Sequence, residues 1–220
     1  MKGALNMKCD KSVMLLYAVT DRAWTGRQTL YEQAEDALKG GITCLQLREK
    51  DLEGDKFYDE AVKIKELCNQ YNVPFIVNDN VEIAVKCGAD GVHIGQEDMD
   101  ASEVRKIIGD NMILGVSAQT VEQAKKAEAD GADYLGVGAV FPTSTKTDAA
   151  DVPIEMLSEI CRAVNIPVTA IGGIKKDNIS KLAGSGVDGI AVVSAIFAAD
   201  DICKECKELR MAVEKAVTED

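Results

Sequence analysis

Three basic side chains, Arg48, Lys50 and Lys146, occur in a 220-residue chain that is otherwise strongly acidic, with 25 basic and 37 acidic residues and a formal net charge of −12. An acidic protein repels free anions, so an anionic ligand must be held by a local cluster of this kind. Asp79 and Asp98 are carboxylates suited to Mg²⁺, which takes a few carboxylates together with phosphate oxygens of a substrate. Cations beside such a pair predict a diphosphate site.

A second candidate site lies in the pairs Gly172-Gly173 and Val193-Ser194. Glycine lets backbone N–H groups approach an anion, and the start of a helix adds a favourable dipole. These pairs therefore predict a site for a phosphate monoester. The competing interpretations are that the glycine pair is only a turn and that the charged residues only solvate a rim.

Both groups need elements that position them, and the hydrophobic pattern supplies these. Short apolar runs alternate with segments of helical periodicity, which is typical of βαβ units around a parallel sheet. The predicted strands are Val13–Val19, Ile42–Leu47, Phe75–Val77, Gly91–Ile94, Ile113–Val116, Tyr134–Val137, Val168–Ile171 and Gly189–Val193. The predicted helices are Thr29–Lys39, Asp55–Tyr71, Val81–Cys87, Ala101–Ile108, Val121–Ala129, Pro153–Val164, Lys176–Ala183 and Ile202–Val217.

Eight strands, each followed by a helix, predict an α/β chain that forms a single (β/α)₈ TIM barrel. A weak repeat supports closure, because a Gly-containing helix stop precedes strands two, four, six and eight, at Gly40-Gly41, Gly88, Gly131 and Gly186. We expect residues 1–220 to be one domain, with a core of about 13–200 and a C-terminal helix of about 202–217. Reactive residues of such barrels lie at the carboxyl ends of the strands, where the polar residues above also fall.

Composition excludes several classes of protein. The acidic balance argues against binding to nucleic acid or to anionic membranes, and one histidine excludes a multi-histidine metal site. Seven scattered cysteines are typical of reduced thiols, and we expect Cys203 and Cys206 to be helix-surface residues. With no secretory or membrane-length apolar run, the chain is expected in the cytoplasm, with small-molecule substrates as its partners. The oligomeric state stays open.

Two further residues and one loop also have an expected role. His93, at the end of the fourth strand, is expected to pack or hydrogen-bond at the rim and not to act as a catalyst. Ser117 has no histidine in a plausible triad, which argues against an acyl-enzyme nucleophile. The Thr, Ser and Lys content of residues 142–150 suggests a lid that closes over substrate.

The motifs taken together are more specific than any one of them. In chain order they are Leu16–Arg22, Gln46–Lys50, Asn78-Asp79, His93–Asp98, Gly115–Ser117, Pro142–Lys146, Ile171–Ile174 and Val193-Ser194. This ordered set resembles the thiamine phosphate synthase (thiamin-phosphate pyrophosphorylase) family over about residues 13–200.

The resemblance implies a transferase that uses Mg²⁺. It would join hydroxymethylpyrimidine diphosphate to a thiazole phosphate, or to its carboxylated form, by a dissociative route that releases diphosphate. It implies that Arg48, Lys50, Ser117 and Lys146 are catalytic and that Asp79 and Asp98 bind the metal. The pyrimidine diphosphate would be held by Gln46, Leu47, Arg48, Glu49, Lys50, Asn78, Ser117 and Lys146. The thiazole phosphate would be held by Thr143, Ser144, Thr145, Gly173, Val193 and Ser194.

Three other functions compete with this one. A thiazole tautomerase-like isomerase would need no diphosphate site, and the retained cations and carboxylates argue against it. A Schiff-base aldolase would use Lys50 or Lys146, but such a lysine usually needs burial to lower its pKa, and both have anion-binding neighbours. A non-catalytic phosphate-ligand sensor would bind without turnover, and nothing in the chain resembles an output domain.

Overall fold

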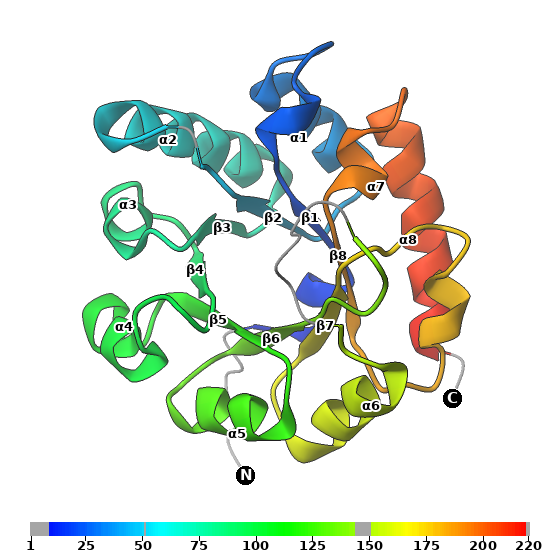
Figure 1. Cartoon of the computed structure of the whole chain (residues 1–220). Helices are drawn as coiled ribbons and strands as arrows, with labels where there is room; N and C mark the ends of the chain where they lie inside the picture. The colour runs from blue at the N-terminus through cyan, green and yellow to red at the C-terminus, as the bar shows by residue number, and fades with distance from the viewer. Residues whose placement is uncertain (1–8, 51, 144–150, 219–220) are drawn as a thin grey trace, which may run out of the picture.

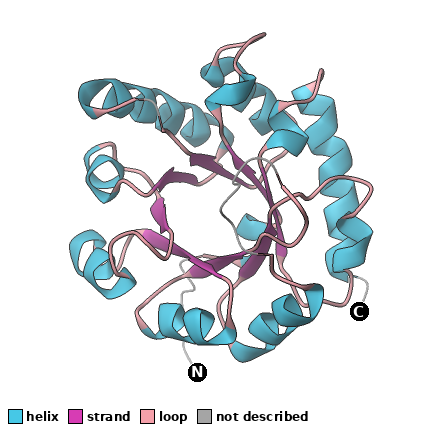
Figure 2. Cartoon of the chain, in the orientation of Figure 1, coloured by secondary structure: helices cyan, strands magenta, loops and turns pink. Residues whose placement is uncertain are grey.

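The computed structural model describes residues 9–50, 52–143 and 151–218, and within them eight parallel strands close into a barrel (Figure 1). Pairing of the first strand with the last closes the ring, which Figure 2 shows surrounded by helices. The predicted (β/α)₈ architecture is therefore confirmed. The strands are β1 (Leu16–Val19), β2 (Cys44–Leu47), β3 (Phe75–Asn78), β4 (Gly91–Ile94), β5 (Ile113–Ala118), β6 (Tyr134–Val137), β7 (Val168–Ile171) and β8 (Gly189–Val192).

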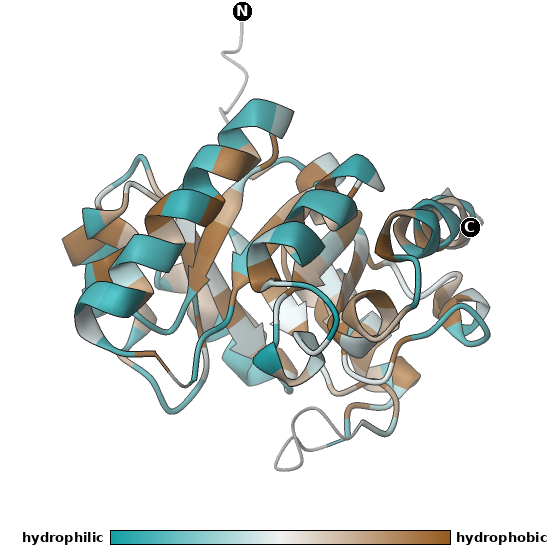
Figure 3. Ribbon diagram, turned by 90° about the horizontal axis from the view of Figure 1, so that it is seen from above, coloured by the Kyte–Doolittle hydropathy of each residue, from teal (hydrophilic) through white to brown (hydrophobic). Residues whose placement is uncertain are grey.

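Seven of the eight predicted helices are present, with small shifts at their ends, and the short helix α7 is additional. The helices are α1 (Leu30–Lys39), α2 (Gly54–Tyr71), α3 (Val81–Lys86), α4 (Ala101–Ile108), α5 (Val121–Ala129), α6 (Ile154–Ala163), α7 (Ser194–Phe197) and α8 (Ile202–Thr218). Thr29 is the N-cap of α1 and not its first residue, because its hydroxyl accepts from Glu32 N–H in a capping box. Figure 3 shows hydrophilic and hydrophobic residues sharing the surface of each outer helix, as expected for helices with one face on the barrel.

The helix predicted over Lys176–Ala183 is wrong. That segment contains only a 3₁₀ turn, η3 (Ile179–Leu182), after β7. The long helix α8 packs against η3, β8 and β1, so it covers this side of the barrel. A short turn that buries Ile179 and Leu182 is then sufficient to link β7 to β8.

The first predicted strand, Val13–Val19, is too long. Its beginning belongs to the 3₁₀ turn η1 (Lys11–Met14), and β1 starts at Leu16. Met14 is fully buried among residues of the barrel interior, so η1 covers the amino-terminal end of the barrel (Figure 1, dark blue). The apolar residues before β1 therefore close the amino-terminal end of the barrel and do not extend the strand.

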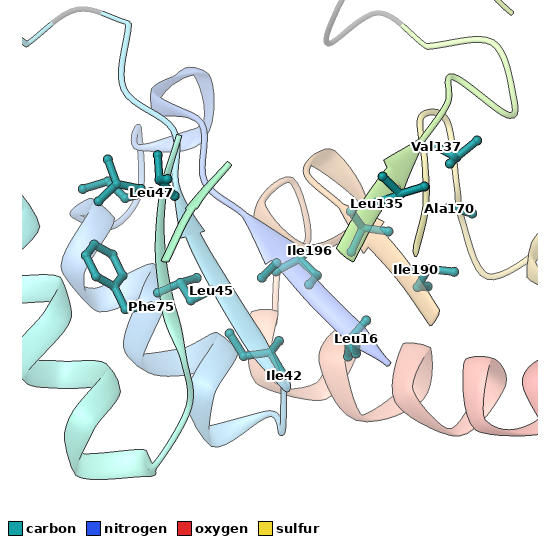
Figure 4. Packing of buried hydrophobic residues seen from close by; sticks show 14 of the residues in the cluster. Leu16, Ile42, Leu45, Leu47, Phe75, Leu135, Val137, Ala170, Ile190 and Ile196 are labelled. Carbon is teal, nitrogen blue, oxygen red and sulfur yellow. The ribbon is translucent and has the colours of Figure 1, made fainter. Parts of the chain in front are cut away.

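The apolar core lies mainly between the outer surface of the strands and the helices. Figure 4 shows part of this cluster, with Leu47 and Phe75 from neighbouring strands. A smaller group of apolar residues fills the inside of the barrel, including Tyr17, Ile76 and Tyr134. Alternate residues of each strand therefore face the two cores, as expected for a closed barrel.

The repeat seen in the sequence has a structural cause at the amino-terminal end of the barrel. The residue directly before each even-numbered strand uses its side chain to accept a hydrogen bond from a backbone N–H at the start of the preceding strand. The donor–acceptor distances are 2.8–2.9 Å. The acceptors are Thr43 Oγ1 and one carboxylate oxygen each of Asp90, Asp133 and Asp188. These side chains supply partners for strand N–H groups that the sheet leaves exposed there.

Candidate functional site

Arg48 lies at the carboxyl end of β2 and is held in place from β1. Its Nη1 donates to Asp21 Oδ2 at 2.9 Å, and its backbone N–H donates to Thr20 Oγ1 at 3.0 Å. Only 14% of the Arg48 side chain is exposed, so the guanidinium lies in a fixed orientation at the rim. Asp21 was not among the predicted site residues, although it lies within the first motif of the set.

Glu49 and Lys50, the next two residues, have different surroundings. The Glu49 carboxylate accepts from Arg22 Nε at 2.6 Å and from the backbone N–H of Lys50 at 2.9 Å, and its side chain is fully covered. Arg22 also pairs with Glu60. Glu49 thus stabilises the β2–α2 loop, and it could reach a ligand only through its main chain. Lys50 is exposed.

Leu47 has no side-chain access to a ligand. It is fully buried in the core between strands and helices, as Figure 4 shows. Gln46, one residue earlier, points to the opposite side and is buried inside the barrel. Of these two predicted binding residues, only Gln46 places a polar side chain at the barrel interior.

Two predicted metal ligands occur on neighbouring loops. Asp79 follows β3, and its backbone N–H donates to His93 O of β4 at 2.8 Å. Asp98 lies on the β4–α4 loop and accepts from Gly95 N at 2.7 Å. Gln96 ties this loop to the next strand, because its Nε2 donates to Ser117 O at 2.6 Å.

The donor set fits Mg²⁺ better than a softer metal. Both carboxylates are exposed, and the described residues contain no cluster of three or more His, Cys, Asp or Glu side chains that could hold a metal alone. A pair of carboxylates leaves coordination positions for water and substrate phosphate, which is the arrangement that Mg²⁺ prefers.

The second candidate site is formed by the ends of β7 and β8. Ile171 lies opposite Ala191 in the sheet, which places Gly173 near Val193, two residues further on each strand. A side chain at Gly173 would meet the carbonyl oxygens of Pro142 and Phe141 at 2.4 and 2.6 Å, so only glycine fits against the β6–α6 loop. Ser194 is the first residue of α7, so a helix begins at this position, as expected for the candidate phosphate site.

The β6–α6 loop is described only in part. Thr143 is half-buried at the end of the described segment. Ser144, Thr145 and Lys146, together with the lid expected over residues 142–150 from position 144 onward, lie outside the described residues. Their expected roles stay predictions.

A chain of hydrogen bonds crosses the barrel interior and joins two of the predicted binding residues. Gln46 Nε2 donates to Tyr17 OH at 2.7 Å, and the hydroxyls of Tyr17 and Tyr134 are 2.8 Å apart. Tyr134 OH lies 2.9 Å from His93 Nδ1, and His93 Nε2 lies 3.0 Å from Ser117 Oγ. Five side chains from five strands therefore form one polar path that begins and ends at the candidate site.

Glycines make room for this path. Gly115 lies between His93 and Tyr134 in the register of β4, β5 and β6, and a side chain there would overlap the Tyr134 ring. Gly136 faces the His93 ring, with Cε1 3.1 Å from where its Cβ would be. Tyr134 is then free to lie edge-on to Tyr17 and tilted against His93, with ring centroids 5.8 and 5.5 Å away.

The path corrects two expectations. His93 does hydrogen-bond, but it is buried inside the barrel and not placed at the rim. Ser117 does have a histidine partner, because its Oγ lies 3.0 Å from His93 Nε2 of the adjacent strand, two residues beyond the Gly115 that pairs with His93. The residue behind the imidazole is a tyrosine hydroxyl and not a carboxylate, so the arrangement still lacks the acid that orients and stabilises the histidine of a triad.

Sequence reasoning missed Tyr17, Tyr134 and Thr169. Thr169 Oγ1 is the one buried side-chain polar atom without a hydrogen-bond partner in the described part of the chain, and it shares a level of the barrel with Ser117. A usable signal existed, since alternate residues of β4, β5 and β6 combine one histidine and one tyrosine with glycines. Large polar rings beside glycines on inward positions indicate a packed polar layer.

Comparison with known proteins gives consistent matches. A family model described as thiamine monophosphate synthase matches residues 16–196. A thiamine-phosphate synthase of Clostridium tetani is 53% identical over 88% of this chain and 93% of that protein, and one of Clostridioides difficile is 49% identical over 92% and 97%. A solved thiamine phosphate pyrophosphorylase of Pyrococcus furiosus superposes with a TM-score of 0.87 at 40% identity, covering 94% of this chain and 98% of that one.

Proposed function

The chain belongs to the thiamine monophosphate synthase family, and from this premise we propose how its barrel performs the reaction. Its activity is that of a thiamine-phosphate synthase, a transferase. We infer that the substrates are hydroxymethylpyrimidine diphosphate and a thiazole phosphate. The observation that supports this proposal is that Arg48, Asp79 and Asp98 follow the carboxyl ends of β2, β3 and β4, with Ser117 near the end of β5.

The reaction breaks one bond and forms another at the same carbon. The C–O bond between the pyrimidine methylene and the diphosphate breaks, and its electron pair leaves with the diphosphate. The thiazole nitrogen then donates its lone pair to the methylene carbon and forms the C–N bond of thiamine phosphate. Because negative charge builds up on the leaving group, oriented cations and N–H or O–H donors lower the barrier most.

The residues have distinct roles in this proposal. Arg48, oriented by Asp21, together with Lys50 and Lys146, holds the diphosphate and stabilises it as it departs. The Ser117 hydroxyl donates a hydrogen bond to the diphosphate. Gln46 and Asn78 bind the pyrimidine diphosphate from the neighbouring strands β2 and β3. Leu47 and Glu49 would contribute only backbone contacts, since their side chains are used within the protein.

We propose Asp79 and Asp98 as the ligands of Mg²⁺. When bound, the ion supplies positive charge that stabilises the departing diphosphate. The two carboxylates come from adjacent loops, and the hydrogen bond from Asp79 N to His93 O supports a fixed position of the first loop.

The thiazole phosphate is placed at the ends of β7 and β8. Gly173, Val193 and Ser194 offer backbone N–H groups there, and Thr143, Ser144 and Thr145 follow β6 in the chain. Glycine is suited to such a position because a side chain would block the approach of an anion to the backbone.

The cytoplasm is the compartment that we propose for this reaction, with small molecules as the partners. All cysteines of the described residues are free thiols, which is typical of a reducing compartment. No described helix combines the length and apolar character that crossing a membrane requires.

Diphosphate release from hydroxymethylpyrimidine diphosphate tests the proposal directly. Release should require both thiazole phosphate and Mg²⁺, and thiamine phosphate should appear in equal amount. The assay is run with each component omitted in turn and at several Mg²⁺ concentrations. Tight binding of thiazole phosphate without any diphosphate release would overturn the assigned chemistry.

A further inference from the structure

We propose that His93 is a positioning residue that acts through Ser117, as the Nε2–H tautomer that sends the Ser117 hydroxyl proton toward the diphosphate. The inference rests on the proposed function only in its last step, where Ser117 meets the substrate. The rest concerns the internal path from Gln46 to Ser117, whose four links measure 2.7 to 3.0 Å.

The order of donors along the path follows from its first member. Gln46 Nε2 is a donor, so Tyr17 accepts from it and has one proton of its own to give. Of the two acceptors beside Tyr17, the Tyr134 oxygen at 2.8 Å is stronger than the Cys44 sulfur, so the proton goes to Tyr134. Tyr134 in turn donates to His93 Nδ1, which therefore carries no hydrogen. A neutral imidazole keeps its one N–H on the other nitrogen, so Nε2–H donates to Ser117 Oγ.

The Ser117 hydroxyl then has one direction left for its proton. Its oxygen already accepts from His93, so its O–H is available to a ligand at the rim, where the side chain is half-buried. In the reverse order Ser117 would give its proton to His93 and present only lone pairs to the diphosphate. An anion favours the first order, because it is bound by donors and repelled by lone pairs.

Burial keeps the two tyrosines suited to this role. Desolvation raises the pKa of both Tyr17 and Tyr134 well above the ordinary value, so both remain neutral hydroxyls that can accept one proton and donate another. Gly115 and Gly136 keep the rings in contact by leaving no side chain between them. The path is thus a buried support for one hydroxyl at the rim.

The tautomer can be read without any substrate. The chain contains a single histidine, so protein labelled with ¹⁵N-histidine and carrying no histidine tag gives one pair of ring-nitrogen signals in a long-range ¹H–¹⁵N correlation spectrum. We expect a protonated Nε2 and an unprotonated Nδ1 at neutral pH, both alone and with inorganic diphosphate and Mg²⁺. An Nδ1–H tautomer or an imidazolium would overturn the proposal.

Two substitutions of His93 test the hydrogen bonds of its two ring nitrogens separately. In His93→Asn the amide oxygen can replace Nδ1 as acceptor for Tyr134, while the donor to Ser117 is lost. In His93→Gln the amide nitrogen can replace Nε2 as that donor. We expect His93→Asn to lower kcat by about 10- to 100-fold with a smaller change in KM, and His93→Gln to recover a large part of the loss.

A double-mutant cycle with Ser117→Ala shows whether His93 acts through the serine. The double variant His93→Asn with Ser117→Ala should be no slower than Ser117→Ala alone, because in this proposal the effect of His93 on the diphosphate passes through the serine hydroxyl. Losses that multiply would overturn the proposal. Tyr31→Phe, which removes an exposed hydroxyl on α1, is the matched control and should leave kcat unchanged.

Failure of the two proposals can be told apart. Wild-type protein that releases no diphosphate would contradict the proposed function, whereas the tautomer is measured without turnover. An active wild type with the wrong tautomer, or with multiplying losses in the cycle, would contradict only the role of His93.

Discussion

At the scale of single residues, the candidate site depends on side chains whose orientation is set by neighbours outside the site. Arg48 is the clearest case, because Asp21 and Thr20 hold its side chain and its backbone. A planar guanidinium binds phosphate well only when its donors face the ligand. We therefore expect residues behind the site to affect catalysis through the orientation of the groups that touch the substrate.

Replacing Asp21 by Asn should misorient Arg48 without removing its charge. We expect kcat/KM for the pyrimidine diphosphate to fall about 10-fold, because a small displacement of an oriented group is costly at an active site. Steady-state kinetics at saturating thiazole phosphate measure this. Asp200→Asn, at the exposed Asp200–Arg27 pair, serves as the control, and equal losses in both variants would contradict the role of Asp21.

Replacing Asp98 by Ala should raise the Mg²⁺ concentration needed for half-maximal rate, because half of the proposed carboxylate pair is lost. A Mg²⁺ titration of diphosphate release measures the shift. Asp100, two residues further on, is engaged instead with Lys126 and Ser102, which lower the pKa of its carboxyl to about 2. Asp100→Asn should therefore leave the titration unchanged, and an unaltered titration of Asp98→Ala would count against the metal site.

Replacing Lys146 by Ala should slow the departure of diphosphate by about 10²-fold, the scale associated with losing one oriented electrostatic contact. Single-turnover measurement of diphosphate release isolates this step from product release. Lys125→Ala, on helix α5, is a control that also removes one lysine charge. A Lys146→Ala variant with wild-type rate would remove Lys146 from the catalytic set.

At the scale of elements, the two ends of the barrel have separate tasks. The carboxyl ends of the strands bear the candidate site, and the amino-terminal end is tied by Thr43, Asp90, Asp133 and Asp188. The three carboxylates each also pair with a basic residue, and the Asp133–Arg105 pair is the most covered, since both of its side chains are only 15% exposed. Because residues at the amino-terminal end stabilise the fold, residues at the carboxyl ends of the strands can be used for binding and catalysis.

Replacing Asp133 by Ala should lower the free energy of unfolding by about 2–3 kcal/mol, since it leaves a backbone N–H of β5 without its acceptor and the Arg105 guanidinium with carbonyl acceptors but no carboxylate. Urea unfolding followed by circular dichroism measures the change. Glu103→Ala, at an exposed ion pair on α4, should leave stability nearly unchanged. The kcat of folded Asp133→Ala should remain that of the wild type, and a large loss would contradict the division between the ends.

At the scale of the whole molecule, closure of the ring joins all eight strands into one structure without an exposed edge. We therefore expect the chain to unfold as a single cooperative unit, as a one-domain protein should. The cysteines can be used to follow unfolding, because most of their side chains are buried in the folded chain. Cys206, expected on the surface of the last helix, is instead fully buried, with its Cβ packed against Gly40.

Alkaline pH should destabilise the folded chain. Burial raises the pKa of four thiols from 9.0 to about 12, namely Cys9, Cys68, Cys161 and Cys206. Above pH 9 the unfolded chain loses protons that the folded chain retains, so stability that is complete below pH 9 is lost as the pH rises toward 12. Urea midpoints at about pH 8 and about pH 10 should fall in that order, and unchanged midpoints would contradict the burial of these thiols.

Much of this protein could be predicted from its sequence because the signals are local. Alternation of strands with amphipathic helices indicates a (β/α)₈ barrel, and in that fold polar residues after a strand must meet at one end. Arg48, Asp79 and Asp98 could therefore be assigned to one rim from their positions alone. The two segments predicted wrongly, at 13–15 and 176–183, are those where packing against distant elements overrides local pattern.

Only the tertiary structure decided what fills the barrel. Tyr17 and Tyr134 are 117 positions apart in the chain, and their hydroxyls meet because ring closure and register bring their inward faces together. The register of β4 and β5 places His93 opposite Gly115, and the His93 ring reaches Ser117 two residues further along β5. Sequence periodicity shows that residues alternate between two faces of a strand, but it does not show which residues of different strands share a level. That pairing is a property of the closed sheet, because hydrogen bonds between strands set it.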